Sequence, residues 1–187
     1  MEVEIAKKRF TVDEYYRMAQ VGILDPNLHT ELINGEIVEM TPMGDRHTEC
    51  VMRATGVFYP AFAAKQAIVS VQNAVRINNI TMPQPDLILF RFRSDFYKGK
   101  CEAKHVLLLI EVSDTTLRYD RNVKLPLYAA AGIAEVWIED LQHNRLLVYL
   151  DPSEKSFTTS LTLAHGDSVS PLAFPEMKVP IDELLGS

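Results

Sequence analysis

Hydrophobic positions in the first third of the chain change from helical to alternating spacing. Thr11 followed by Glu14 forms a T-x-x-E capping pattern, which predicts a helix through VDEYYRMAQ. ELINGEIVEM (31–40) predicts a β-hairpin, because the Asn-Gly pair at its centre is the strongest short hairpin signal. Residues 47–65 predict a helix, in which Pro60 indicates a kink or break.

Short apolar runs in the middle of the chain predict the strands of a central sheet. Residues 67–78 alternate loosely and predict one strand. PDLILF (85–90) and HVLLLIEV (105–112) have the continuous apolar character of buried strands in a mixed sheet. AEVWIED (134–140) predicts a further core strand.

A helix is predicted between the last two of these strands, in YDRNVKLPLYAAAGI, and it ends at Gly132. Pro126 belongs to its early turns, where a missing N–H does no harm, so Lys124 lies near the helix start. RLLVYL and SFTTSLTL predict a hairpin around Asp151-Pro152, and SPLAFPEMKVPIDELL predicts an irregular strand with a short terminal helix. This order predicts a single α/β (α+β) domain over residues 1–187, with helices flanking a mixed central sheet.

The composition is that of a globular domain and indicates where in the cell the protein is expected. The 187 residues are 47% hydrophobic and 24% charged, which is ordinary for a soluble protein. No apolar run approaches the ~20 residues of a membrane span, and MEVEIAKKRF has no apolar signal core. Cys50 and Cys101 show neither metal-ligand spacing nor a disulfide framework, so a cytoplasmic protein with reduced thiols is expected.

The formal net charge of −6 counts against tight, nonspecific nucleic-acid binding, which usually needs a basic face. The basic residues form only small groups, at Lys7–Lys8–Arg9, Arg91–Arg93 and Lys98–Lys100. Either the substrate-facing surface is locally basic, or much of the acidity belongs to a metal site. The sequence leaves both possibilities open.

Two carboxylates stand where a packed sheet should carry none. Asp86 heads PDLILF and Glu111 interrupts VLLLIEV, and such charges are costly unless they are paired or bound to a cation. Asp86 alone could cap a turn, and Lys124 alone could be a solvated helix residue, whereas Glu111 is harder to explain structurally. Together they predict a divalent-metal site for phosphoester hydrolysis. Asp86 and Glu111 would be the ligands of Mg²⁺, with Mn²⁺ as a substitute.

At these residues the chain resembles a known family. QPDLILF and LIEVSDTTLRYDRNVKLPLYAAAGIAEVWIED look like the signature of the Uma-type endonucleases, which have the PD-(D/E)XK restriction-endonuclease-like fold. ELINGEIVEMTPMGDRHTE is similar to the family's N-terminal stretch, so the resemblance covers roughly residues 10–185. It implies a mixed central sheet flanked by helices, with an N-terminal helix and hairpin.

The resemblance also implies catalytic roles for individual residues. Asp86 matches the aspartate of the PD pair, and Glu111 matches the second acid. The standard lysine position, two residues after that acid, holds Ser113 here, and Lys124 matches a lysine that this family places on the following helix. Glu31 matches an extra glutamate that completes such sites from an N-terminal element.

Several nearby residues have both a functional and a structural interpretation. Glu36 flanks the same turn as Glu31, and either could complete the site. His47 could carry a proton or contact phosphate, although starting its helix is the simpler role. Tyr128 lies one turn after Lys124 and could touch substrate, although a core position is the simpler reading.

The leading functional hypothesis is a Mg²⁺-dependent DNA endonuclease that acts as a homodimer, because cutting both strands calls for two active sites. The alternative is a catalytically weak or inactive nucleic-acid-binding or interaction module with the same fold. A metallohydrolase for small phosphoesters is a third possibility. Recognition sequence, DNA or RNA, and single or double strand cannot be read from the chain.

Overall fold

The computed structural model describes residues 6–40 and 42–186, and a six-stranded sheet lies at its centre. The strands follow the order β3-β4-β5-β6-β7-β8, and neighbours are antiparallel except for the parallel pair β5 and β6. Their bounds are β3 Ala67–Val71, β4 Leu87–Arg91, β5 Val106–Ser113, β6 Glu135–Asp140, β7 Arg145–Pro152 and β8 Phe157–Ala164. The predicted mixed sheet is therefore confirmed.

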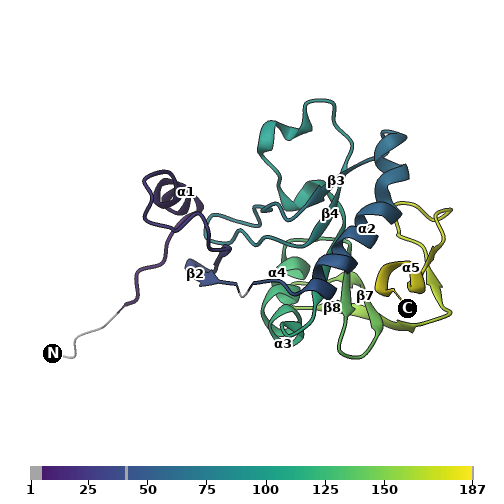
Figure 1. Cartoon of the computed structure of the whole chain (residues 1–187). Coiled ribbons are helices and arrows are strands. Elements are labelled where there is room, and N and C mark those ends of the chain that lie inside the picture. Colours follow the sequence, from purple (N-terminus) through teal and green to yellow (C-terminus); the bar gives the residue numbers. More distant parts are fainter. Residues whose placement is uncertain (1–5, 41, 187) are drawn as a thin grey trace.

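Helices cover both faces of this sheet (Figure 1). On one face, α2 (Asp45–Ala63) and α5 (Ile181–Leu185) bury an apolar core that includes Phe58 and Trp137. On the other face, α4 (Leu125–Ala130) buries a second core that includes Tyr128 and Ile138. Both faces of the central strands are buried in this arrangement. This is why their sequences are continuously apolar and do not alternate between apolar and polar residues.

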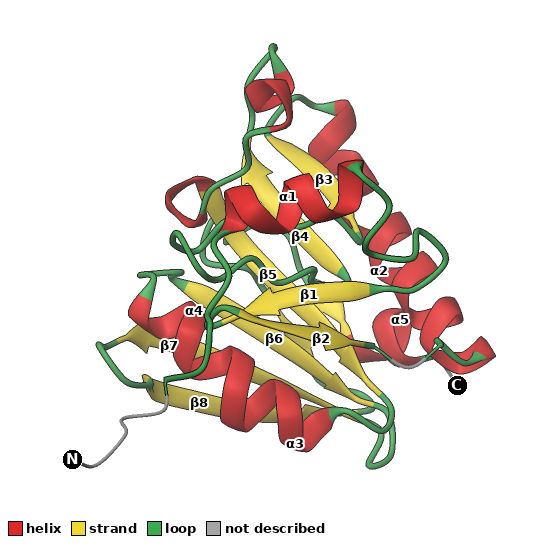
Figure 2. Cartoon of the chain, turned by 90° about the vertical axis from the view of Figure 1, so that its left-hand side faces the viewer, coloured by secondary structure: helices red, strands yellow, loops and turns green. Residues whose placement is uncertain are grey.

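An N-terminal unit lies beside the sheet and consists of α1 (Val12–Gln20), β1 (Thr30–Ile33) and β2 (Glu36–Glu39) (Figure 2). The predicted capping box is present, because the Glu14 N–H donates to the Thr11 hydroxyl at 3.2 Å and the Glu14 carboxylate accepts from the Thr11 N–H. The predicted hairpin is also present. Its turn residues Asn34 and Gly35 both have positive φ, 51° and 79°.

Three predicted boundaries are wrong. The strand predicted over residues 67–78 ends at Val71, because Gln72 has a φ of 51° that turns the chain out of the sheet. The helix is not broken at Pro60, since α2 continues through it to Ala63. The predicted hairpin of β7 and β8 is present, but its turn lies just after Asp151-Pro152, since Pro152 still pairs with Phe157.

The helix that carries Lys124 begins earlier than predicted. It starts with the short α3 (Leu117–Tyr119) and continues through a π-helical segment, η3 (Asp120–Lys124), into α4. In the wide turn of η3 the Leu125 N–H donates to the Asp120 carbonyl, five residues back. Such a turn leaves room for the Pro126 ring inside a continuous helix, which the sequence pattern did not reveal.

The remaining elements are short. They are the 3₁₀ turns η1 Phe96–Gly99 and η2 Ala103–His105, and the strands β9 Ser168–Val169 and β10 Val179–Pro180. The irregular strand and short terminal helix predicted for the tail correspond to β10 and α5. Over the described residues, every helix is too short or too polar to cross a lipid bilayer.

Candidate active site

Asp86 and Glu111 come together because β4 and β5 are antiparallel neighbours. Leu87 pairs with Ile110, so Asp86 and Glu111 lie at the same end of the two strands. The Val112 N–H donates to Asp86 Oδ2 at 2.8 Å, which fixes the first carboxylate to the backbone of the second strand. The two carboxylates that the sequence singled out are therefore neighbours.

Lys124 reaches the same place from the helix after β5. Its Nζ lies 2.9 Å from Glu31 Oε1 and 3.3 Å from Glu111 Oε1. The Asp120 Oδ1 atom, one turn earlier on the helix, lies 3.7 Å away. All four side chains are nearly inaccessible to solvent, so the lysine charge is enclosed by carboxylates.

Glu31 enters this cluster from strand β1 of the N-terminal hairpin. Its Oε1 accepts the Gln84 N–H at 2.8 Å in addition to the Lys124 contact, whereas its buried Oε2 has no hydrogen-bond partner among the residues that the structure describes. Glu36, the alternative, is exposed on β2. The geometry thus places Glu31 in the cluster and Glu36 outside it.

His47 approaches from α2 and contacts Asp86. Its Nε2 lies 3.1 Å from Asp86 Oδ1, and its buried Nδ1 has no hydrogen-bond partner in the described part of the chain. Burial disfavours the charged imidazole, but the hydrogen bond to Asp86 and the charge of that carboxylate outweigh it and raise the pKa of His47. Both oxygens of Asp86 therefore have donors, one from a side chain and one from the backbone.

Asp120 is a buried acid that the sequence analysis did not single out. Its Oδ2 accepts the Ser113 hydroxyl at 2.7 Å and the Thr116 hydroxyl at 2.6 Å, while its Oδ1 faces Lys124. Ser113, which occupies the standard lysine position, thus reaches the cluster through Asp120. The available signal was the spacing, because residues four apart on a helix share a face.

Tyr128 is both a core residue and part of the cluster. Its hydroxyl donates to Glu111 Oε1 at 2.5 Å, and the ring is fully buried against the sheet. Burial, together with the charge of Glu111, raises the pKa of Tyr128 well above its ordinary value. The hydroxyl therefore remains protonated and keeps donating to Glu111.

Electrostatics in the cluster are dominated by an excess of carboxylates over cations. Burial raises the pKa of Glu111 well above its ordinary value, and Asp120, Asp86 and Glu31 add to that effect while Lys124 opposes it. Burial also disfavours the charged form of Lys124, but the surrounding carboxylates outweigh it and raise the lysine pKa. One ammonium group cannot neutralise this many acids, so the site favours an additional cation.

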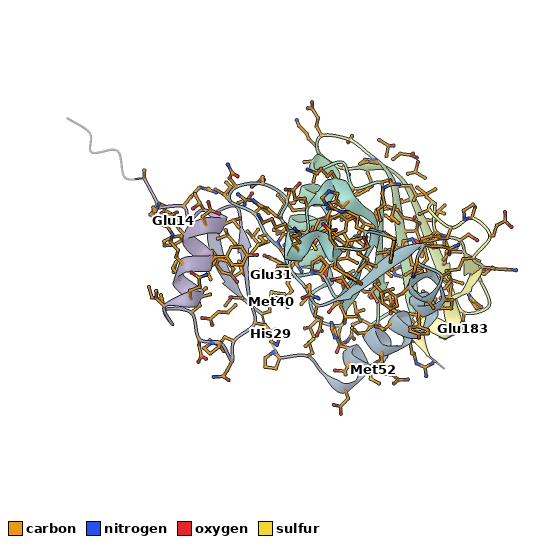
Figure 3. All side chains as sticks on the ribbon, turned by 90° about the horizontal axis from the view of Figure 1, so that it is seen from above. Glu14, His29, Glu31, Met40, Met52 and Glu183 are labelled. Carbon is orange, nitrogen blue, oxygen red and sulfur yellow. The ribbon has the colours of Figure 1, made fainter. Side chains whose placement is uncertain are left out.

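A cavity of about 360 Å³ opens onto these residues. The hairpin side contributes Glu31, His29 and Met40, and Figure 3 shows these three between the hairpin and the rest of the molecule. The opposite wall includes Asp86 and Lys124. The volume is that of a small-molecule site and leaves room for part of a substrate beside the carboxylates.

The residues present fit a divalent cation that keeps some of its waters. Within residues 6–40 and 42–186 no three His, Cys, Asp or Glu side chains form a ready-made ion cage. Mg²⁺ does not need one, because it usually binds through one or two carboxylates and retains several waters. Asp86 and Glu111, with the unpartnered Oε2 of Glu31 nearby in the cluster, supply that kind of donor set.

Comparisons with known proteins identify the fold and the family of the chain. A solved structure described as a putative nuclease belonging to DUF820, from Anabaena variabilis ATCC 29413, has a TM-score of 0.71 at 15% sequence identity. The alignment covers 94% of this chain and 97% of that one, which shows a common fold. The curated proteins yielded no match. The family Uma2, described as "Putative restriction endonuclease", matches residues 12–182, and the chain therefore belongs to the Uma2 family.

Proposed function

We propose that this protein is a metal-dependent DNA endonuclease, in which Asp86 and Glu111 hold Mg²⁺ and Mn²⁺ can substitute. The observation that carries the proposal is the convergence of Glu31, Glu111 and Asp120 on the buried Lys124, beside Asp86. Membership of the Uma2 family and a nuclease-like fold support the same reaction class. Buried charges in such number are rarely retained for stability alone.

The bound metal ion would activate a water and neutralise the phosphoryl oxygens of the scissile phosphodiester. Lys124 contributes a fixed positive charge next to the same position, where it stabilises the negative charge that develops in the transition state. Glu31 and Asp120 keep the ammonium group of Lys124 protonated and hold it in position, since both contact Nζ. Lys124 on its helix thus takes the role that a lysine on the strand has in the standard pattern.

Two further residues orient the carboxylates. His47 donates to Asp86, and Tyr128 donates to Glu111, so each acid is held by a side chain from a different helix. A carboxylate whose rotamer is fixed before the metal arrives loses less conformational freedom on binding it. His47 and Tyr128 are therefore positioning residues in this proposal.

The test is cleavage of plasmid and oligonucleotide substrates, with and without Mg²⁺ or Mn²⁺, by the wild type and by Asp86→Asn, Glu111→Gln and Lys124→Ala. Each variant should lower the rate by about a hundredfold or more, the usual effect of losing a group that stabilises the transition state. Metal-dependent cleavage that survives Glu111→Gln or Lys124→Ala would contradict the assigned roles.

The N-terminal hairpin offers a matched control for the fourth residue. Glu31→Gln should reduce cleavage, because Lys124 loses its closest carboxylate, whereas Glu36→Gln on the exposed neighbouring strand should leave it unchanged. Calorimetric titration with Mn²⁺ separates the alternative, a nucleic-acid-binding module without catalysis. That alternative predicts no metal binding and an unchanged DNA affinity in Asp86→Asn.

A further inference from the structure

The loop between β4 and β5 is basic in an acidic protein. Residues 91–104 contain five lysine and arginine residues against two acidic ones, whereas the whole chain has 19 against 25. The loop leaves the sheet at the end of β4 that is opposite Asp86 and projects at the top of the view in Figure 1. Five residues of strand at ~3.3 Å each put it about 17 Å from the carboxylates along β4.

Three of these cations have no carboxylate partner within the described residues. Arg91, Lys98 and Lys100 are exposed and form no ion pair, whereas Arg93 pairs with Asp95 at 2.6 Å. Lys104 and Glu102 also pair, at 2.5 Å. The unpaired charges remain available for an external anion.

Phe96 stands among these cations with half of its surface exposed to solvent. The neighbouring ring of Tyr97 points the other way and is buried, stacked on His105 with ring centroids 4.3 Å apart. The Tyr97 hydroxyl donates to the Arg91 carbonyl at 2.5 Å. The buried Tyr97 therefore holds the loop in place, while the side chain of Phe96 remains exposed to solvent.

The backbone at this point holds an unusual conformation. Phe96, Tyr97 and Lys98 are consecutive non-glycine residues with φ of 47°, 54° and 49°. Such a run persists only where the surrounding contacts determine it, and here the buried ring of Tyr97 and the Asp95 carboxylate, which accepts the Tyr97 N–H, do so. The loop thus presents an aromatic ring and cations from a rigid base.

We propose that this loop, residues 91–104, binds a single-stranded stretch of the polynucleotide substrate. Lys98 and Lys100 contact phosphates, and Phe96 stacks on an unpaired base, the combination by which single strands are held without sequence preference. This inference rests on the proposed nuclease function, and it supplies the positive surface that the net charge of the chain does not provide. A duplex would leave Phe96 without a base face to stack on.

The experiment measures binding of a labelled single-stranded oligonucleotide by fluorescence anisotropy in EDTA, so that cleavage does not interfere. Phe96→Ala should weaken binding about tenfold, the scale of one lost stacking contact. The double variant Lys98→Ala/Lys100→Ala should also weaken binding and should reduce the slope of log affinity against log salt by about 1.4, for two lost phosphate contacts. Thermal melting verifies that each variant is folded.

The matched control variants remove exposed lysines and an exposed aromatic ring outside the loop. Lys155→Ala/Lys178→Ala deletes two exposed lysines, and Tyr59→Ala deletes an exposed aromatic ring, and neither should change the affinity or the salt slope. Wild-type affinity in both loop variants would overturn the proposal, as would absence of binding by the wild type at low salt. A loss confined to duplex DNA would overturn the single-strand assignment.

The binding measurement does not depend on catalysis, so failure of the binding loop and failure of the nuclease function can be distinguished. If the loop variants weaken binding but the wild type cleaves no polynucleotide with any metal, the nuclease function fails and the binding loop stands. If the wild type cleaves and the loop variants bind and cleave as it does, the binding loop fails and the nuclease function stands.

Discussion

Lys124 is surrounded by more negative charge than one ammonium can balance. Removing it leaves Glu31, Glu111 and Asp120 buried without a counterion. We expect Lys124→Met to lower the free energy of unfolding by about 3 kcal/mol at neutral pH, the scale of a broken buried ion pair. Urea denaturation measures it, and the double variant with Glu111→Gln should recover part of the loss.

Glu139 is a further buried acid, and its carboxylate has no hydrogen-bond partner within the described residues. Both carboxylate oxygens lack hydrogen bonds, and burial, with the charge of Asp86, raises its pKa well above the ordinary 4.5. The folded state therefore holds a proton that the unfolded state releases. Stability from this group is present below pH 4.5 and is lost as the pH rises toward the raised folded pKa.

The direction of this pH dependence can be tested by a substitution at Glu139. Glu139→Gln, which cannot ionise, should be more stable than the wild type at pH 8 and nearly equal to it at pH 4, when both are measured by denaturation in EDTA. A variant whose difference from the wild type is the same at both pH values would show that the residue does not titrate in the fold.

Of the four candidate site residues, Asp86 and Glu111 stood out from the sequence because a carboxylate is costly in their context, whereas Lys124 and Glu31 depended on the family resemblance. Asp86, Glu111, Glu31 and Lys124 combine an acid-and-lysine pattern with a family resemblance, and the structure brings them together. The role of His47 could not be predicted in this way. Its contact with Asp86 depends on how α2 packs against the sheet, which no local pattern encodes.

At the scale of the elements, the N-terminal hairpin matters because it carries Glu31. Its turn requires Gly35, which has a φ of 79° and whose added Cβ would lie 2.6 Å from Arg9 Cβ. Gly35→Ala should therefore destabilise the hairpin by more than about 1 kcal/mol and should also reduce cleavage. Thermal melting and a cleavage assay measure the two effects.

Gly22 is the control for this element. It has a similar φ of 76°, but an added Cβ would meet nothing within 4 Å. Gly22→Ala should thus show only the backbone penalty and should cleave normally. Equal losses in both variants would mean that the close approach of Arg9 does not matter.

Helices and strands could be predicted where the local sequence preference agrees with the tertiary structure. Their predicted ends were wrong where the two disagree. The capping box at Thr11 and the Asn34-Gly35 turn are local signals and were confirmed. Proline was a less reliable signal. Pro126 lies in the first turn of α4 as predicted, although a π-helical segment precedes it, whereas α2 continues through Pro60 without a break.

At the scale of the whole molecule, one chain carries one cluster of carboxylates and would cut one strand at a time. We expect a two-fold homodimer on duplex DNA, because closed symmetry would set two such sites on opposite strands. Sedimentation velocity with a duplex oligonucleotide in EDTA should show a complex with the mass of two protein chains plus the DNA. A monomer both with and without DNA would contradict the expectation.

The fold class was predictable as a whole, because alternating helical and apolar segments limit the possible layer arrangements. The charge distribution was not predictable in the same way. The −6 balance argued against a nucleic-acid surface, and only the folded chain shows that Arg91, Lys98 and Lys100 form no ion pair within the described residues, whereas the neighbouring Arg93 and Lys104 each pair with an acid.

Ser113 and Lys124 both touch the Asp120 carboxylate, one by a hydrogen bond at 2.7 Å and the other by a contact at 3.7 Å. The standard lysine position and the position used here therefore open onto the same few ångströms of space. A sequence search that demands a lysine two residues after the acid would pass over this chain, although Lys124 lies 3.3 Å from that acid. A search for proteins with the same arrangement should therefore compare where the ammonium group lies in space and not where the lysine stands in the sequence.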